Sequence, residues 1–112
     1  MFSQKNRLRK KNDFDRVFKQ GRGYRHGFLF LKVLDNDLGF TRFGVVVSKK
    51  ISNKAVVRNK IKRQLREILK KKTDTVKKGL DIVFLTNSGI EKENFKDIEQ
   101  EVEEILKKAG II

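Results

Sequence analysis

Apolar side chains recur at helical spacing in three segments of the chain. In the longest segment, Val57, Ile61 and Leu65 are followed by Ile68 and Leu69. Such spacing places the apolar side chains on one face of a helix. We therefore predict helices over residues 12–20, 54–72 and 94–108. Short polar residues that suit helix caps precede the first two of them, namely Asn12 for the first and Ser52 or Asn53 for the second.

Strands are indicated between these helices. Residues 28–34 are almost continuously apolar, which is typical of a strand covered on both faces. A second strand is expected at 40–48, a short buried one at 81–86, and a short extended piece at 23–25. Residues 35–39 have the composition of a turn, so we predict that the strands on either side of them form a hairpin.

The resulting order of elements is α-β-β-β-α-β-α. This order is typical of an α+β fold, and we predict a two-layer α-β sandwich with the helices packed on a small sheet. A chain of 112 residues is long enough for one domain with a single modest core, so residues 1–112 are expected to form one domain.

Composition excludes several classes of protein. The chain has no cysteine and no proline, so a disulfide framework, a zinc ribbon and a proline-rich linker are ruled out. No apolar run approaches the roughly 20 residues that span a bilayer. The N-terminus lacks the apolar stretch of a secretory signal. We expect a cytoplasmic protein with no membrane partner.

Charge points to a polyanionic partner. The net charge is +14, and residues 1–66 hold 19 basic and 4 acidic residues, whereas residues 67–112 hold 9 and 10. Within the basic part, residues 1–11 form an arm with little apolar content, which is typical of a flexible segment. Such an excess of charge destabilises a compact fold by self-repulsion, so it favours a protein that binds nucleic acid.

The basic helix over 54–72 has its cations on the side opposite its apolar face. Arginines there can bind phosphates through two parallel hydrogen bonds, and lysines act as point charges. A solvated face without a ligand is the usual explanation of a charge run, but the net charge of the chain opposes that reading.

The stretch KAVVRNKIKRQLRE at residues 54–67 resembles the signature helix of the bacterial ribonuclease P protein component. That family has an Arg-Asn-Arg core, then Lys-Arg, and a further Arg one turn on. The segments 6–10, 13–21, 44–50 and 81–83 are similar to the family's opening arm, first helix and the strands on either side of the signature. Two departures are visible. Lys60 replaces the usual second Arg and loses its bidentate fork, and the loop at 52–54 is one residue longer than a common form.

This resemblance implies the protein subunit of a ribonucleoprotein that removes the 5′ leader of precursor tRNA. The RNA partner would perform the hydrolysis with Mg²⁺, held mainly by the RNA and the substrate, so no protein side chain would be catalytic and none would bind a metal alone. The resemblance also implies a left-handed βαβ crossover through the basic helix. The protein by itself is expected to be monomeric.

Two sets of site residues follow from the resemblance. Contacts with the catalytic RNA are expected from Lys49, Lys50, Lys54, Arg58, Asn59, Lys60, Lys62, Arg63 and Arg66. A cleft between the first helix and the sheet would bind the leader through Phe14, Phe18, Phe28, Phe30 and Lys32. Strand alternation would place the last three of these on one face. Pattern alone favours a core role for Phe14 and Phe18, and both roles hold if their rings are half-buried.

Two other functions remain open. A ribosomal or ribosome-assembly protein would share the size, charge and fold class, and only the motif separates it from the first interpretation. A stand-alone nuclease is disfavoured because no nucleophilic triad, phosphate loop or metal-ligand cluster is present. His26, the only histidine, is interpreted as a surface residue, and Asp35 and Asp37 as turn residues.

Overall fold

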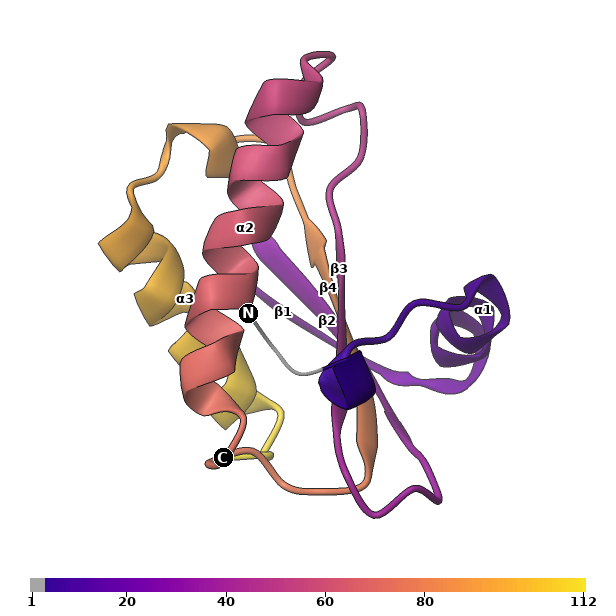
Figure 1. Ribbon diagram of the computed structural model, residues 1–112. Coiled ribbons are helices and arrows are strands. Elements are labelled where there is room, and N and C mark those ends of the chain that lie inside the picture. The colour runs from indigo at the N-terminus through magenta and orange to yellow at the C-terminus, as the bar shows by residue number, and fades with distance from the viewer. Residues whose placement is uncertain (1–3) are drawn as a thin grey trace.

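The structure is a computed structural model that describes residues 4–112. A four-stranded sheet has helices on both of its faces (Figure 1). The strands are β1 (Arg22–His26), β2 (Leu29–Asp35), β3 (Arg42–Val46) and β4 (Leu80–Thr86). The helices are α1 (Lys11–Gln20), α2 (Ala55–Lys72) and α3 (Phe95–Lys108), with short 3₁₀ helices η1 (Gln4–Asn6) and η2 (Ile90–Lys92). The predicted class and order of elements are confirmed.

The strand order in the sheet is β1-β2-β4-β3. β4 is antiparallel to β2 and parallel to β3, and the chain passes from β3 to β4 through α2 as a βαβ crossover. The first five residues of β4 are all buried, so this strand needs cover on both faces and a neighbour on each side. The last strand in the sequence therefore lies inside the sheet.

The predicted hairpin between residues 28–34 and 40–48 is wrong, because β4 lies between β2 and β3. The connection from β2 to β3 crosses the start of β4 and is fastened to it. The backbone N–H of Asn36 donates to the Gly79 carbonyl at 2.8 Å, and Thr41 Oγ1 donates to the Lys77 carbonyl at 2.6 Å. A turn-like composition identified the connection correctly but did not reveal that the two strands it joins are not paired with each other.

The main core lies between the sheet and the pair α2 and α3. Leu29, Leu31 and Val33 of β2 point into it. The predicted apolar face of α2 is confirmed by its buried side chains, which are Ile61, Leu65, Ile68 and Leu69. This part of the molecule is the expected two-layer sandwich.

α1 adds a partial layer on the opposite face of the sheet (Figure 1). Val17 is the buried residue of α1, and it joins Leu8 and Val83 in a small second cluster. Phe14 is half-buried against the same cluster. α1 thus rests on little apolar surface.

The described part of the basic arm lies against the sheet. Arg7 pairs in parallel with Phe43 of β3, and the backbone N–H of Leu8 donates to the Phe43 carbonyl at 2.8 Å. The Leu8 side chain is buried, which explains why the arm lies along the free edge of β3. Residues 1–3 lie outside the described residues.

The expected helix caps are also wrong. The N-cap positions are Lys10 for α1 and Lys54 for α2, and neither side chain makes a capping hydrogen bond. Ser52 Oγ instead accepts a hydrogen bond from the backbone N–H of Lys54 at 3.1 Å, which shapes the loop before the helix. Among the described helices, none is long and apolar enough to cross a membrane.

Candidate nucleic-acid interface

The cations of α2 lie in two rows. Arg58, Lys62 and Arg66 are spaced one turn apart, so they lie above one another along the helix. All three are half-buried, and they occupy the flank next to the apolar face. Asn59 and Arg63 are exposed on the outer side. The structure therefore brings these five predicted contacts together on one continuous surface, which we call the α2 surface.

Lys60 lies on a different flank of α2. At about 100° per residue it is roughly 120° from Arg66 around the helix axis. Lys71, about three turns further on, shares that flank and forms an ion pair with Glu99 of α3 at 3.6 Å. The position where the resembled family usually has its second Arg therefore faces the α3 side, away from the row of Arg58, Lys62 and Arg66.

Three further predicted contacts lie just before the helix. Lys49, Lys50 and Lys54 are all exposed. The loop that carries them is fixed by the buried side chain of Ile51 and by Arg58, whose Nη1 donates to the Ser52 carbonyl at 2.8 Å. One donor of Arg58 is thus committed to the loop, and its remaining donors are left for a ligand.

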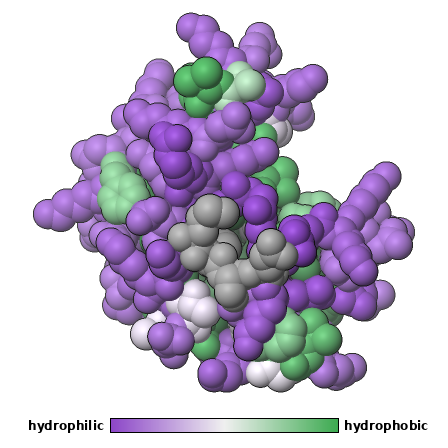
Figure 2. All heavy atoms as spheres, viewed as in Figure 1, coloured by the Kyte–Doolittle hydropathy of each residue, from purple (hydrophilic) through white to green (hydrophobic). Residues whose placement is uncertain are grey.

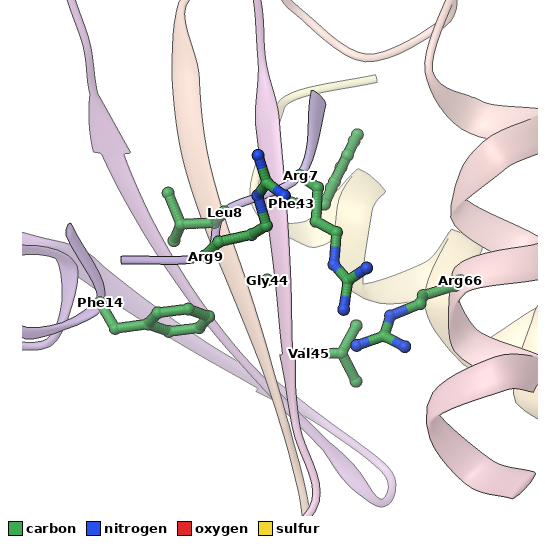
Figure 3. A pocket seen from close by; sticks show the side chains of 8 residues that line it. All are labelled: Arg7, Leu8, Arg9, Phe14, Phe43, Gly44, Val45 and Arg66. Atoms are coloured by element: carbon green, nitrogen blue, oxygen red, sulfur yellow. The ribbon is translucent and has the colours of Figure 1, made fainter. Parts of the chain in front are cut away.

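A hollow of about 310 Å³ lies at the free edge of β3 (Figure 3). Its lining comes from four segments of the chain: Arg7, Leu8 and Arg9 of the arm, Phe14 of α1, Phe43, Gly44 and Val45 of β3, and Arg66 of α2. Gly44 is necessary for this arrangement. A Cβ atom at that position would lie 2.6 Å from the Phe14 ring.

Arg7 and Arg66 point toward one another across this hollow (Figure 3). Burial lowers the pKa of Arg66, and the positive charge of Arg7 lowers it further. Within residues 4–112, neither guanidinium group has a carboxylate within ion-pair distance. Two like charges therefore line one partly desolvated hollow.

Sequence reasoning placed Arg7 and Arg9 in a basic arm and did not include them among the site residues. Only their contact with the β3 edge brings them to α2, and that contact leaves no periodicity in the sequence. The one available signal was Leu8, an apolar residue within a basic run, which indicates that the arm packs against the fold.

The two rings of α1 differ in exposure, since Phe14 is half-buried and Phe18 is exposed. The ring centroids of Phe14 and Phe18 are 6.4 Å apart, and Phe18 is 36% exposed. Phe30 and Lys32 lie on the same face of the sheet as α1, because Leu29, Leu31 and Val33 alternate toward the main core. Phe30 also lies 5.8 Å from the guanidinium carbon of Arg25. We call Phe14, Phe18, Phe30 and Lys32 the α1 surface.

Phe28 does not belong to this surface, and the predicted shared face with Phe30 is wrong. Phe28 lies in the turn between β1 and β2, where strand alternation does not apply, and its ring packs against the main core. Its backbone N–H donates to Glu101 Oε1 of α3 at 2.7 Å. The role of Phe28 in the structure is to fix this turn on α3.

An ion network fixes α1 on the sheet. Asp81 of β4 is fully buried and accepts hydrogen bonds from Arg42 Nε at 2.8 Å and Arg42 Nη2 at 2.6 Å. Arg42 also reaches Asp13 of α1 at 3.3 Å, and Arg16 of α1 reaches Asp81 at 3.4 Å. Asn36 Nδ2 donates to the same carboxylate at 2.8 Å. This network compensates for the small apolar contact of α1.

Polar residues cover most of the face that includes α2 and the arm (Figure 2). Two acidic residues of α3 form ion pairs with lysines near the end of α2, at Lys71–Glu99 and Lys72–Glu103. In the described part of the chain, no group of three or more His, Cys, Asp or Glu side chains is arranged to hold a metal ion.

Comparison with known proteins shows which proteins this chain resembles in sequence and in fold. A family profile described as Ribonuclease P matches residues 2–110. A ribonuclease P protein component from a Pseudanabaena strain is 41% identical over 100% of this chain and 97% of its own length. The Staphylococcus aureus RNase P protein superposes with a TM-score of 0.88 at 30% identity, covering 95% of this chain and 96% of that one. The Thermotoga maritima RNase P protein gives a TM-score of 0.83 at 30% identity, with 91% and 96% covered.

Proposed function

The chain belongs to the ribonuclease P protein family, and on this premise we propose that its two surfaces bind two different RNA segments. As the protein component of ribonuclease P, it is a subunit of an endoribonuclease. The family match over 2–110 also decides against the ribosomal alternative, which only the motif had opposed. The α2 surface would bind the catalytic RNA, and the α1 surface would bind the 5′ leader of precursor tRNA.

The row of Arg58, Lys62 and Arg66 is the observation that carries this proposal. Their stems pack beside the apolar face of α2, so the charged ends are held at fixed spacing rather than dispersed in solvent. Successive phosphates of a nucleic-acid backbone match such an array better than a single small anion does. Arg63 and the lysines of the preceding loop extend the positive surface, and Lys60 would contact RNA on the α3 side of the helix.

The α1 surface supports leader binding through a different chemistry. Phe14 and Phe18 offer ring faces on which unpaired bases can stack, and such stacking is worth about 1–3 kcal/mol per base. Lys32 adds a cation on the same face, where it would contact a phosphate. A mixture of aromatic rings and cations is typical of surfaces that bind single strands without reading sequence.

Catalysis is assigned to the RNA partner, with Mg²⁺ held mainly by that RNA and the substrate. In this arrangement the protein acts by supplying positive charge close to closely packed phosphates. It therefore reduces the concentration of divalent ions that the complex needs, because part of the phosphate repulsion is already neutralised.

Reconstitution tests the proposal directly. The protein is combined with a bacterial ribonuclease P RNA, and cleavage of precursor tRNA is measured at low and high Mg²⁺. We expect strong stimulation at low Mg²⁺ that fades as Mg²⁺ rises. A leaderless mature tRNA serves as the binding control. Absence of stimulation at low Mg²⁺ would overturn the proposed function.

A further inference from the structure

We propose that Arg7 and Arg66 together hold a single RNA phosphate at the free edge of β3. This inference rests on the proposed function and assigns a ligand to the hollow of Figure 3. It also connects the two surfaces, because the hollow is lined by Phe14 of the α1 surface and by Arg66 of the α2 surface.

The two guanidinium groups come from different parts of the fold, and each is carried by a fixed stretch of backbone. Arg7 is positioned through its backbone, which pairs with Phe43, so its side chain carries no part of that attachment. Arg66 projects from the middle of α2, one residue after the fully buried Leu65. The backbone positions of both arginines are therefore fixed by the fold, and both side chains line the same hollow.

The electrostatics of the free protein are unfavourable at this point. Arg66 is partly desolvated, and the charge of Arg7 makes its protonated form less favourable still. By contrast, Arg16 and Arg42 both have Asp13 and Asp81 as partners. A phosphate between Arg7 and Arg66 would convert the repulsion into two charge-assisted contacts.

The surroundings indicate a phosphate that belongs to a polynucleotide rather than a free ion. The hollow is about as large as the smaller ligand sites of proteins, well beyond a single anion. Gly44 presents no side chain at its floor, and the Phe14 ring lies on the far side of that glycine. An RNA strand could thus place a phosphate at the arginines and the neighbouring base or ribose over Gly44 toward Phe14.

The salt dependence of RNA binding tests whether the two arginines share one phosphate. The variants are Arg7→Gln, Arg66→Gln and the double variant, with Lys107→Gln on α3 as the matched control. For a shared phosphate, each single variant weakens binding but leaves the log–log salt slope nearly unchanged, because the other arginine still neutralises the phosphate. The double variant then loses about 0.7–0.9 of slope, the value of one phosphate contact.

Two separate phosphates would give a different result, which would overturn the proposal. Each single variant would then lose about 0.7–0.9 of slope, and the double variant would lose about twice that. No loss of slope in the double variant would overturn it as well. If the wild-type protein fails to bind ribonuclease P RNA at all, the proposed function itself fails, so the two failures are distinguishable.

Two binding experiments identify the source of the phosphate. One titrates the protein with ribonuclease P RNA alone, and the other titrates the assembled holoenzyme with leader-bearing precursor against mature tRNA. The pattern expected for a shared phosphate should appear in one of these experiments, and its absence from both rejects the site.

Thermal unfolding at low salt provides a check on folding. Arg7→Gln should not lower the midpoint, since it removes a like charge, and a lowered midpoint would assign Arg7 a structural role instead.

Arg7→Lys keeps the test decisive if a glutamine variant does not fold. Lysine retains the charge but loses the planar fork, so binding should weaken while the salt slope is kept. Full affinity in this variant would contradict a bidentate contact at Arg7.

Discussion

Arg42 and Asp81 face each other on the neighbouring strands β3 and β4 and form a two-pronged ion pair, with donor–acceptor distances of 2.8 and 2.6 Å. The carboxylate has no solvent exposure. Through Asp13 and Arg16 the same pair holds α1, so one buried charge fixes the position of the helix that carries Phe14 and Phe18.

Asp81→Asn should strongly destabilise the fold. The substitution leaves the Arg42 guanidinium without its main counter-charge, and breaking a buried pair in this way costs about 3–5 kcal/mol. The free energy of unfolding in urea measures the loss. Asp35→Asn, at an exposed end of β2, is the matched control and should change stability by less than about 0.5 kcal/mol. Equal effects of the two changes would contradict the assigned role of Asp81.

The same carboxylate predicts a loss of stability in acid. Burial alone would raise the pKa of Asp81, but hydrogen bonds from Arg42 and Asn36 and the charges of Arg42 and Arg16 outweigh it, so its pKa is lowered from the usual range of an aspartate. A group with a lowered folded-state pKa contributes stability above its unfolded pKa and loses it as the pH falls through the folded value. Urea unfolding from pH 6 downward should therefore show a decline below roughly pH 4–5 that is weaker in Asp81→Asn. Parallel pH profiles would count against this assignment.

Arg63→Ala should weaken binding to ribonuclease P RNA and reduce the log–log salt slope by about 0.7–0.9, the value of one phosphate. Arg63 is exposed on α2, so its removal should leave the thermal midpoint unchanged. Affinity measured between low and high salt provides the slope. Lys107→Ala removes the same charge from α3 and should leave both quantities as in the wild type. A slope that does not respond to Arg63→Ala would exclude this side chain from the RNA interface.

Phe18→Ala should selectively weaken binding of leader-bearing precursor tRNA. The ring is 36% exposed, so its loss removes a stacking surface worth about 1–3 kcal/mol, or roughly 5- to 150-fold in affinity. Binding of the holoenzyme to precursor and to mature tRNA gives the comparison. Leu38→Ala, at an exposed apolar residue of the β2–β3 connection, is the control. Equal losses for both tRNAs would show that the Phe18 ring is only structural.

Gly44→Ala should displace the Phe14 ring, because the added Cβ would lie 2.6 Å from it. Overpacking of this kind typically costs about 1–3 kcal/mol. Adding Phe14→Leu should restore much of the lost stability, since the smaller side chain leaves room for the methyl group. Urea unfolding of the two single variants and the double variant completes this cycle. Additive losses would mean that the two residues do not compete for the same space.

The sequence allowed the elements to be predicted far better than their pairing. Helical spacing identified α2 and its buried face because Ile61, Leu65 and Ile68 interact within one local segment. The place of β4 between β2 and β3 depends on contacts between residues far apart in the chain, such as Thr41 with Lys77, which no local pattern records.

The candidate site divides in the same way. The motif located the α2 surface, and helix geometry then fixed the directions of its cations. Phe28 was misplaced because alternation was extended past the end of the strand into a turn. Arg7 was missed because its position depends on the arm lying against Phe43. The parts of the site that a single helix determines were predictable, and the parts that depend on packing between segments were not.

The position of β4 also determines when the protein can fold during its synthesis. β3 and α2 have been made once residue 72 is added, yet the partner that joins β3 to the rest of the sheet is completed only at Thr86. Until then the growing chain can form no more of this sheet than the hairpin of β1 and β2. The highly basic first part of the polypeptide therefore leaves the ribosome before its sheet can close, and it gains a defined RNA-binding shape only after the more acidic last part has begun to emerge.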